Sequence, residues 1–395
     1  MTVPKFRFTF WKAVFLVIMV AGVYATYVRF AKGLGASTNL SDQFPWGLWI
    51  GFDVMCGVML AAGGFTLTAA VEIFNIKRWH SIMRPTILTA FMGYLLVCAA
   101  LMYDLGLPWN IWHPLIMRNP HSVMFEVAYC VMLYTTVLAL EFSPIVFERL
   151  GWHRALKAVR SVMIVLVILG VLLSTLHQSS LGTLYLIMPN KLHAFWYSPL
   201  LPVFFFLSAI AVGLAMIIFE SSMSSKYFGR EIELPILRDM GRVLVVVLAI
   251  YGILRFEDLY HRGVLHLVFV PGYEQGFFLL EILLSVLIPL VLLMVPKVRE
   301  SAQGLYFVAV LTLLGFVTNR LNVAITGVEN AVGARYTPRW TEVVITAMFV
   351  ALGFAIFGVA ARFLPIFPEE KAHVPALPRM EGVRAEIGVP VHAGD

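Results

Sequence analysis

Charged residues are scarce in this sequence. Asp, Glu, Lys and Arg make up 13% of the 395 residues, whereas apolar residues make up 60%. A soluble domain has about 25% charged and about 45–50% apolar residues, so the composition excludes an ordinary soluble enzyme. The formal net charge of +6 does not indicate nucleic-acid binding, because the basic residues are distributed as in a membrane protein.

Cysteine is also rare. Cys56, Cys98 and Cys130 all lie inside apolar segments, and none belongs to a C-x-x-C motif. This spacing excludes an iron–sulfur cluster or zinc site held by the chain itself, and it gives no case for a disulfide framework. The sequence also lacks a phosphate-binding loop, a dinucleotide-binding glycine fingerprint and an obvious nucleophile motif. We therefore expect no metal bound by this chain.

Long apolar segments account for most of the chain. A membrane span needs about 20 apolar residues, and runs this continuous are typical of helices. Ten segments qualify, each bounded by proline, glycine or charged residues: 11–30, 47–74, 82–104, 122–145, 158–179, 199–220, 241–262, 275–296, 304–327 and 340–364. We predict an all-α integral membrane protein with about ten transmembrane helices in residues 1–365. Residues 366–395 are rich in Pro, Glu and Ala, which predicts a disordered cytoplasmic tail.

The basic residues indicate the orientation of these spans. Most of the 29 Lys and Arg residues fall in the two termini and in the loops that join spans 2–3, 4–5, 6–7 and 8–9. The remaining loops hold few of them: Arg29, Lys32, Arg118, Lys191, Arg262, Arg335 and Arg339. Cytoplasmic loops are enriched in Lys and Arg, so both termini are predicted to be cytoplasmic.

Three ionisable residues toward the outer ends of the spans suggest a site. Asp53, Glu126 and His177 come from three predicted helices and are flanked by apolar or small residues. An ionisable residue at the centre of a membrane helix costs about 2.5–3.5 kcal/mol on insertion scales, so its presence is informative. We expect these residues to converge in one polar pocket, with Gln178 beside His177. Three independent structural roles are the alternative.

A second polar region is predicted in the later spans. Arg255 and Asp258 lie on the seventh span, and Arg320 lies on the ninth. The three-residue spacing of Arg255 and Asp258 suits a structural ion pair as well as a binding role.

Glutamates also lie toward the inner ends. Glu72, Glu141 and Glu220 belong to three different spans. They suit a hydrated proton pathway from the cytoplasm, because a carboxylate that faces lipid has an unfavourable free energy. The alternative is that they are interfacial residues without a role.

An acid–histidine pocket near one membrane face suits quinone chemistry. A quinone takes up or releases two protons for every two electrons, and carboxylic acids and histidine are the side chains that exchange such protons. Haem b would need paired axial histidines on facing helices. Only His177 and His261 lie near membrane depth, so we expect no haem, and electrons must be exchanged with a partner's cofactors. A Soret band in the purified protein would favour the haem alternative.

Several segments resemble the NrfD/PsrC family. They are residues 44–49 (FPWGLW) followed by Asp53, 122–126 (SVMFE), 174–182 (STLHQSSLG), 191–193 (KLH) with Trp196, and 218–220 (IFE). The similarity covers about residues 10–365 and is greatest to the longer members, the cytochrome b-type subunits of group 1 nickel–iron hydrogenases (HybB) and the DsrP-like anchors of sulfur-metabolism complexes.

The resemblance implies a haem-free, quinone-reactive subunit with two four-helix bundles plus flanking helices. Such subunits lie in the cytoplasmic membrane of bacteria or archaea, dock an extracytoplasmic ferredoxin-like protein with several [4Fe–4S] clusters, and react with menaquinone or ubiquinone. The family's quinone pocket lies in the first bundle near the outer face, where Asp53, Glu126 and His177 are predicted here. The resemblance does not determine which catalytic subunit is attached.

The sequence therefore predicts the quinone-reactive subunit of a respiratory complex, with a nickel–iron hydrogenase as the first choice of catalytic partner. Alternatives are a sulfur-metabolism or cytochrome-linked complex, or a proton-coupled transporter. The outer loops around 105–120 and 180–198 would contact the iron–sulfur partner. Their aromatic residues suit either a protein interface or the membrane's aromatic belt: Trp109, Trp112, Trp196 and Tyr197.

Overall fold

The protein is helical throughout the part that the computed structural model describes, residues 9–367. Nine of its described segments are long and apolar enough to cross a membrane. They are Phe10–Lys32, Trp49–Ile73, Lys77–Asp104, Val123–Leu150, Met163–Leu186, Leu201–Phe228, Tyr273–Met294, Ala302–Val332 and Trp340–Phe363. The predicted all-α integral membrane fold is confirmed.

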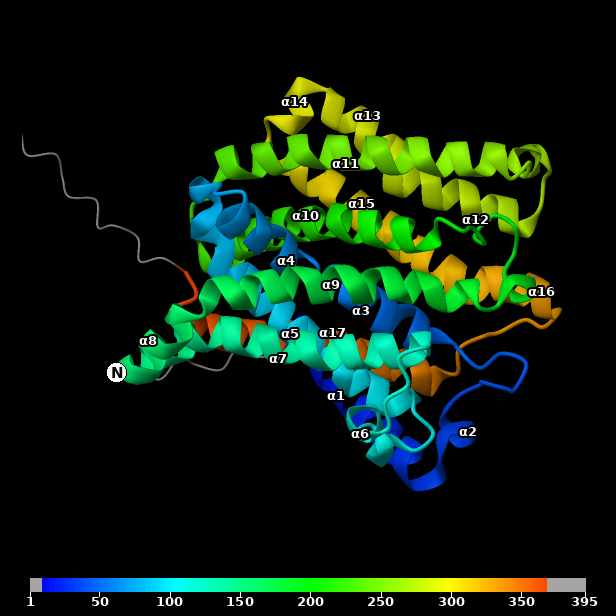
Figure 1. The fold of residues 1–395 in the computed structure, drawn as a ribbon, viewed down its shortest axis with the longest axis horizontal. Coiled ribbons are helices and arrows are strands. Elements are labelled where there is room, and N and C mark those ends of the chain that lie inside the picture. The colour runs from blue at the N-terminus through cyan, green and yellow to red at the C-terminus, as the bar shows by residue number, and fades with distance from the viewer. Residues whose placement is uncertain (1–8, 368–395) are drawn as a thin grey trace, which may run out of the picture.

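A tenth long helix corresponds to the seventh predicted span. Helix α11 (Leu234–His261) has 28 residues, as many as its neighbour α10 (Leu201–Phe228), and runs alongside it (Figure 1). It is not among the nine because charged residues occupy both of its ends, among them Asp239 and Arg255. The sidedness of the termini stays a prediction, since it depends on counting α11 as a span.

The long helices form two groups of four with a flanking pair (Figure 1). The first group holds the broken helix η1–α3–α4–η2 (Trp49–Ile73), α5 (Met83–Asp104), α7 (Val123–Leu150) and α9 (Met163–Leu186). The second holds α10, α11, the chain α12–η7–α13 (Tyr273–Met294), and α15 (Ala302–Leu321) continued by η8 and α16 to Val332. The pair α1 (Phe10–Lys32) and α17 (Trp340–Phe363) packs on the outside of the first group. Helices α9 and α10 join the two groups.

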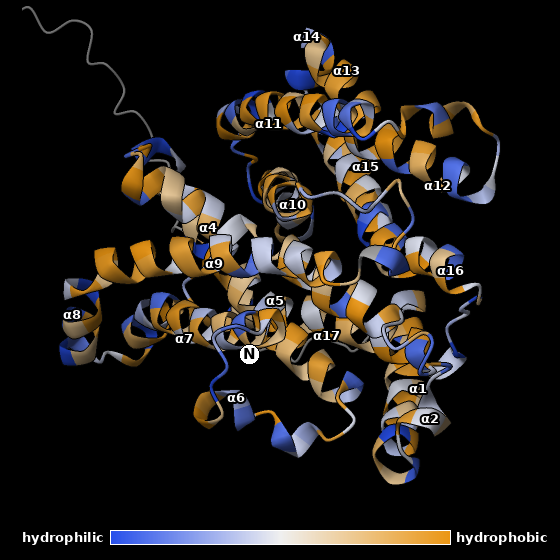
Figure 2. Cartoon of the chain, turned by 45° about the vertical axis from the view of Figure 1, so that its right-hand side comes forward, coloured by the Kyte–Doolittle hydropathy of each residue, from blue (hydrophilic) through white to orange (hydrophobic). Residues whose placement is uncertain are grey.

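The two ends of the bundle differ in charge. One end, called the basic end below, carries η3 (Lys77–Ile82), α8 (His153–Ser161) and α14 (Pro296–Arg299). The opposite end carries α2 (Leu34–Ser37), α6 (His113–Ile116) and the loop 187–200. Hydrophobic residues follow the long helices, whereas hydrophilic residues gather on α8 and in the connections (Figure 2). This distribution is that of a protein surrounded by lipid along its length.

The broken helix runs through the centre of the molecule. It consists of π-helical η1 (Trp49–Cys56), α3 (Gly57–Leu60), a turn at residues 61–62, α4 (Gly63–Thr68) and π-helical η2 (Ala69–Ile73). Glycine lets two neighbours approach it: a Cβ atom on Gly213 of α10 would lie 2.9 Å from the carbonyl carbon of Ala62, and one on Gly64 would lie 2.5 Å from the Cβ atom of Ala90 on α5. π-Helical turns frequently mark functional sites.

One predicted span begins in the wrong place. Residues 158–179 were expected as the fifth span, but α8 ends at Ser161 and α9 extends to Leu186. His177 therefore lies nine residues, or about 13 Å, before the end of its helix, deeper than the sequence suggested. The predicted tail lies outside the described residues from position 368 onward.

Candidate functional site

His177 is on α9, faces α5 and α7, and is fully buried. Its Nδ1–H donates to the carbonyl oxygen of Leu173 at 2.8 Å, which leaves Nε2 to accept from the hydroxyl of Tyr94 on α5. The rings of Tyr94 and Tyr134 lie 5.4 and 5.5 Å from the imidazole. Both ring nitrogens are thus engaged, an arrangement that suits proton exchange with Tyr94 rather than axial ligation of haem.

Glu126 lies about one helical turn farther than His177 from the basic end of the bundle. It sits in the first turn of α7, where Ser122 caps the helix and the helix dipole favours a carboxylate. The hydroxyl of Ser180 on α9 donates to Glu126 Oε1 at 2.6 Å. Ser180 is three residues from His177, so α9 brings Glu126 and His177 together on adjacent helices.

Asp53 belongs to a different group of side chains. It lies in η1, is buried, and accepts a hydrogen bond from Thr346 Oγ1 of α17 at 2.8 Å. Its charge interacts with that of Asp104, the last residue of α5. Within residues 9–367, no hydrogen bond or ion pair joins Asp53 to Glu126 or His177. Of the three residues predicted to form one pocket, Glu126 and His177 therefore lie in one region, and Asp53 lies in another group of side chains.

Several buried polar atoms around His177 have no hydrogen-bond partner in the described structure. They are Tyr134 Oη, Ser174 Oγ and Gln178 Oε1. The amide nitrogen of Gln178 donates to the carbonyl oxygen of Val58 at 3.0 Å, so only its oxygen is left over. More than nine in ten buried polar groups in proteins are paired, and such atoms mark places where water or the polar atoms of a ligand bind.

The second polar region is built around Glu281 of α12, which is fully buried. Its carboxylate accepts from Trp196 Nε1 at 2.8 Å, Asn319 Nδ2 at 2.7 Å and Asn322 Nδ2 at 2.9 Å. The guanidinium of Arg255 lies 4.0 Å away. A buried carboxylate needs several hydrogen bonds and a cation to offset its lost hydration, and Glu281 has both.

Arg255, Asp258 and Arg320 all contribute to this region. Arg320 donates to Ser208 Oγ at 2.7 Å and to Asn319 Oδ1 at 2.8 Å. Arg255 donates to the Phe195 carbonyl at 2.9 Å, and Asp258 accepts from Ser198 Oγ at 2.7 Å. Two of the three thus hold the loop 187–200, as does Trp196. This arrangement favours a structural role for the second polar region.

The inner glutamates fall into two places. Glu141 of α7 is buried, and its Oε1 atom would lie 3.0 Å from a Cβ atom on Gly170 of α9. Glu72 is exposed in η2, which packs on the same helix α9.

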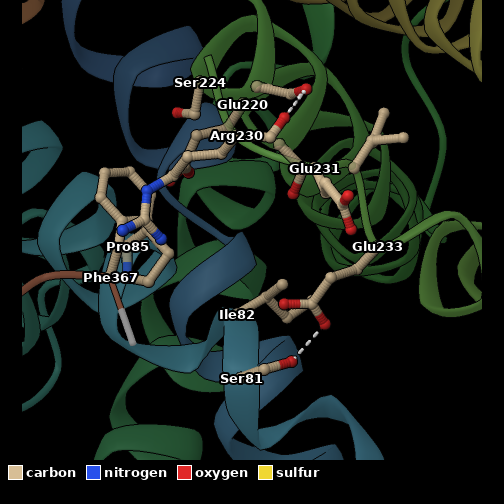
Figure 3. A pocket seen from close by; sticks show the side chains of 12 residues that line it. Ser81, Ile82, Pro85, Glu220, Ser224, Arg230, Glu231, Glu233 and Phe367 are labelled. Atoms are coloured by element: carbon tan, nitrogen blue, oxygen red, sulfur yellow. Dashed lines mark hydrogen bonds between the residues drawn. The ribbon is translucent and has the colours of Figure 1, made fainter. Parts of the chain in front are cut away.

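Glu220 of α10 lies apart from this pair. It is buried, and its Oε2 atom has no partner among the described residues. It lines a cavity of about 70 Å³ at the basic end, together with Ser224 and Glu233 (Figure 3). Glu233 accepts a hydrogen bond from Ser81 at this cavity.

The loop end carries two titratable groups outside the spans. Burial lowers the pKa of His193, whose Nδ1 accepts from the backbone N–H of Phe195 at 3.2 Å. Burial, with a hydrogen bond to Glu342, raises the pKa of Tyr336. The hydroxyl of Tyr336 also accepts from the backbone N–H of Leu48 at 3.0 Å, which connects the start of the broken helix to α17.

Sequence reasoning missed Tyr94, Tyr134 and Ser174. Helical spacing contains the signal for two of them, because residues seven apart share one face of a helix. Tyr134 shares a face with Glu141, and Ser174 lies between Gly170 and His177 on one face of α9. A tyrosine in an apolar segment resembles ordinary core, so composition alone does not single it out.

The chain matches the family described as "Polysulphide reductase, NrfD" over residues 36–332. It is 38% identical to the probable Ni/Fe-hydrogenase 2 b-type cytochrome subunit of Escherichia coli (strain K12), over 87% of this chain and 88% of that protein. It is 29% identical to the menaquinone reductase integral membrane subunit of Nitratidesulfovibrio vulgaris, over 92% and 93%. The Hdr-like menaquinol oxidoreductase integral membrane subunit of Archaeoglobus fulgidus is 22% identical, over 88% and 91%.

Proposed function

The chain belongs to the NrfD family, and from this membership we propose that it is the quinone-reactive membrane subunit of a respiratory oxidoreductase complex. It would exchange electrons between an extracytoplasmic, ferredoxin-like iron–sulfur protein and menaquinone or ubiquinone. A nickel–iron hydrogenase is the first choice of catalytic partner. A sulfur-metabolism complex is the alternative.

Two kinds of observation support this function. Two relatives are integral membrane subunits of a menaquinone reductase and of a menaquinol oxidoreductase, and a third is a hydrogenase b-type cytochrome subunit. The similarity to them extends over most of both chains. The observation that carries the proposal is the pair of contacts Ser180–Glu126 and Tyr94–His177 on adjacent helices of an apolar bundle. A carboxylate and an imidazole, each with a hydroxyl partner, are the groups that quinone protonation needs.

The mechanism assigns each residue a step. The bundle offers apolar surface to the quinone ring and tail. Glu126 lies half-buried near the helix end, where a quinone that diffuses in the bilayer can reach it, and it exchanges one proton with a quinone oxygen. His177 exchanges the second proton with the quinone, and its Nε2 atom exchanges that proton with Tyr94. Asp53 and Asp104 form an acid pair that exchanges protons with the outside.

The iron–sulfur partner is proposed to dock on the end opposite the basic one. Trp109 and Trp112 are 66% and 47% exposed there and offer aromatic anchors. Trp196 was expected to serve the same purpose, but it is completely buried and donates to Glu281, so it is not available to a partner. Its role is to hold the loop 187–200.

Proton exchange with the basic end is the remaining part of the proposal. Glu72, Glu141 and Glu220 would take protons from the cytoplasm, which makes turnover electrogenic if those protons reach the quinone. The buried Glu141 lies on α7 and the exposed Glu72 on η2, and both elements pack on α9, which supports this route.

The test is to purify the chain with its partners from the native membrane. We expect metalloproteins with iron–sulfur clusters to co-purify, and the complex to transfer electrons to or from a short-chain quinone analogue. A complex that purifies without any iron–sulfur protein, or that shows no quinone-linked turnover with a competent catalytic subunit, would contradict the proposal.

A further inference from the structure

We propose that Tyr134, Ser174 and Tyr94 carry protons between Glu141 and His177, and so connect the basic end of the bundle to the quinone site. This inference rests on the proposed function, because it supplies the route by which quinone protons cross the first helix group. Tyr134 lies outside the motifs of the sequence, and Ser174 begins the segment 174–182 without a role assigned to it.

The alignment of the neighbouring helices α7 and α9 places the residues of this route side by side. Helix α7 runs toward the basic end and α9 runs back from it, so the two are antiparallel and pack along their length. Tyr134 and Glu141 are seven residues apart and share one face of α7. Gly170, Ser174 and His177 share one face of α9 in the same way. In the antiparallel pair, Glu141 meets Gly170, and Tyr134 meets Ser174 and His177.

The first step lies at the basic end. Glu72 is exposed in η2 at the end of the broken helix, and η2 packs on α9, the helix that also borders the buried carboxylate of Glu141. Gly170 leaves room for that carboxylate, since a Cβ atom there would lie 3.0 Å from Glu141 Oε1 and 3.6 Å from the Tyr134 ring. Glu141 thus lies beside Gly170 and close to the ring of Tyr134.

The second step passes along hydroxyl groups. The ring of Tyr134 and the Oε1 atom of Glu141 both border Gly170, and the Tyr134 ring lies 5.5 Å from the imidazole of His177. Ser174 lies three residues before His177 on the same face of α9, and Tyr94 hydrogen-bonds to Nε2 of His177. The rings of Tyr94 and Tyr134 pack edge to face, 4.6 Å apart between centroids. These residues lie between Glu141 and His177, and ordered water would bridge the hydroxyls that no hydrogen bond joins.

Unused hydrogen-bonding capacity distinguishes this line from ordinary core. Tyr134 Oη and Ser174 Oγ are buried and have no hydrogen-bond partner in the described structure. A phenylalanine and an alanine would fill these positions without leaving a buried polar atom unpaired, a defect that costs about 1–3 kcal/mol. Ordered water that binds to such atoms completes a chain of donors and acceptors.

The proton balance is simple. When a quinone is reduced, it gains two electrons from the iron–sulfur partner and one proton on each oxygen. Tyr94 passes its hydroxyl proton to His177 Nε2, and His177 gives that proton to one quinone oxygen while Glu126 protonates the other. Tyr94 then regains a proton from Ser174, Ser174 from Tyr134 and Tyr134 from Glu141, through the bound water that joins these groups. Each hydroxyl gives and receives one proton and keeps its charge. Glu141 is reprotonated from the side of Glu72, and quinol oxidation runs the same line in reverse.

The experiment compares Tyr134→Phe and Ser174→Ala with the wild type. The whole complex is reconstituted in proteoliposomes, and quinone-linked turnover is measured together with the charge moved per electron. Tyr251→Phe is the matched control, since Tyr251 is a buried tyrosine of α11 in the second helix group. Both substitutions, Tyr134→Phe and Ser174→Ala, remove only an unpaired hydroxyl, so the complex should still assemble. We expect the charge moved per electron, or the turnover rate, to fall by about tenfold or more, with Tyr251→Phe unchanged.

Gly170→Ala provides an independent check, because its new methyl group would displace the Glu141 carboxylate while leaving every hydroxyl in place. It should reduce charge movement as well. The proposal is overturned if Tyr134→Phe keeps both the rate and the charge movement of the wild type, or if the wild type turns over without moving charge. If the wild type shows no quinone-linked turnover, the proposed function fails, and this inference fails with it. If Tyr134→Phe does not assemble, Ser174→Ala and Gly170→Ala decide the question.

Discussion

The two helix groups differ in how their buried polar side chains are paired by hydrogen bonds. Glu281 in the second group accepts three hydrogen bonds and lies beside Arg255. In the first group, Tyr134 and Ser174 are equally buried but have no partner among the described residues. Of the ten buried side-chain atoms without a partner in residues 9–367, seven lie between Trp79 and Tyr185, and three belong to Glu220, Arg238 and Arg255 of the second group.

The difference separates a structural polar network from one suited to proton exchange. A fully paired buried network holds its helices and loops in one arrangement, and a proton has no vacant acceptor in it. Unpaired acceptors have unfavourable free energy unless water or a ligand binds to them. The second group therefore positions the loop 187–200, and the first group is the place where substrate and protons would move.

The largest effect is expected from breaking the paired network. Glu281→Ala leaves the buried cations Arg255 and Arg320 without their nearest anion, which should destabilise the protein by about 3–5 kcal/mol. We expect the complex to be lost or its unfolding temperature in detergent to fall sharply. The matched variant Glu281→Gln keeps the size and one hydrogen-bond acceptor, so it should be less damaging. An unchanged unfolding temperature for Glu281→Ala would remove the basis of the comparison.

The next effect is on turnover alone. Glu126→Gln and His177→Ala remove proton-exchanging groups from the first helix group, where one such group contributes about 10²- to 10⁴-fold to a rate. Quinone-linked turnover should be abolished while the partner subunits still co-purify. Full activity with a quinone analogue would exclude both residues from the mechanism, whereas loss of the complex would indicate a structural role.

A smaller effect should distinguish the two inner glutamate positions. Glu141 belongs to the proposed proton line to His177, whereas Glu220 lines a separate cavity at the basic end (Figure 3). Glu141→Gln should therefore reduce charge movement in proteoliposomes more than Glu220→Gln does. Equal losses would mean that both carboxylates serve one route. If neither variant changes the rate or the charge movement, these glutamates are interfacial residues only.

The smallest effect concerns docking. Trp109→Ala should weaken binding of the iron–sulfur partner by about 1–2 kcal/mol, as for an aromatic residue at a protein interface. Trp152, which is 57% exposed at the basic end, provides the control variant Trp152→Ala. Affinity of the detergent-solubilised membrane subunit for its partner is the measurement. A loss caused by Trp152→Ala but not by Trp109→Ala would reverse the docking side.

Part of the site could be predicted from residue type and position. Glu126 and His177 stand out because an ionisable side chain in an apolar segment is costly, and hydrogen bonds do involve both in one region of the bundle. Asp53 has the same signal, yet it pairs with Thr346 of α17, a helix that begins nearly three hundred residues later. Trp196 was predicted from its position in an outer loop to be a surface aromatic residue, but it is buried and donates a hydrogen bond to Glu281.

The sequence by itself determined that the chain is a bundle of membrane helices and which helices carry acids, because hydrophobic length and charge are properties of each segment alone. It also determined which residues share a face, since the helical period does not depend on neighbours. Only the tertiary structure decided which faces meet. The contacts of Tyr94 with His177 and of Trp196 with Glu281 depend on how neighbouring helices align. That alignment follows from close packing between distant segments rather than from the local sequence.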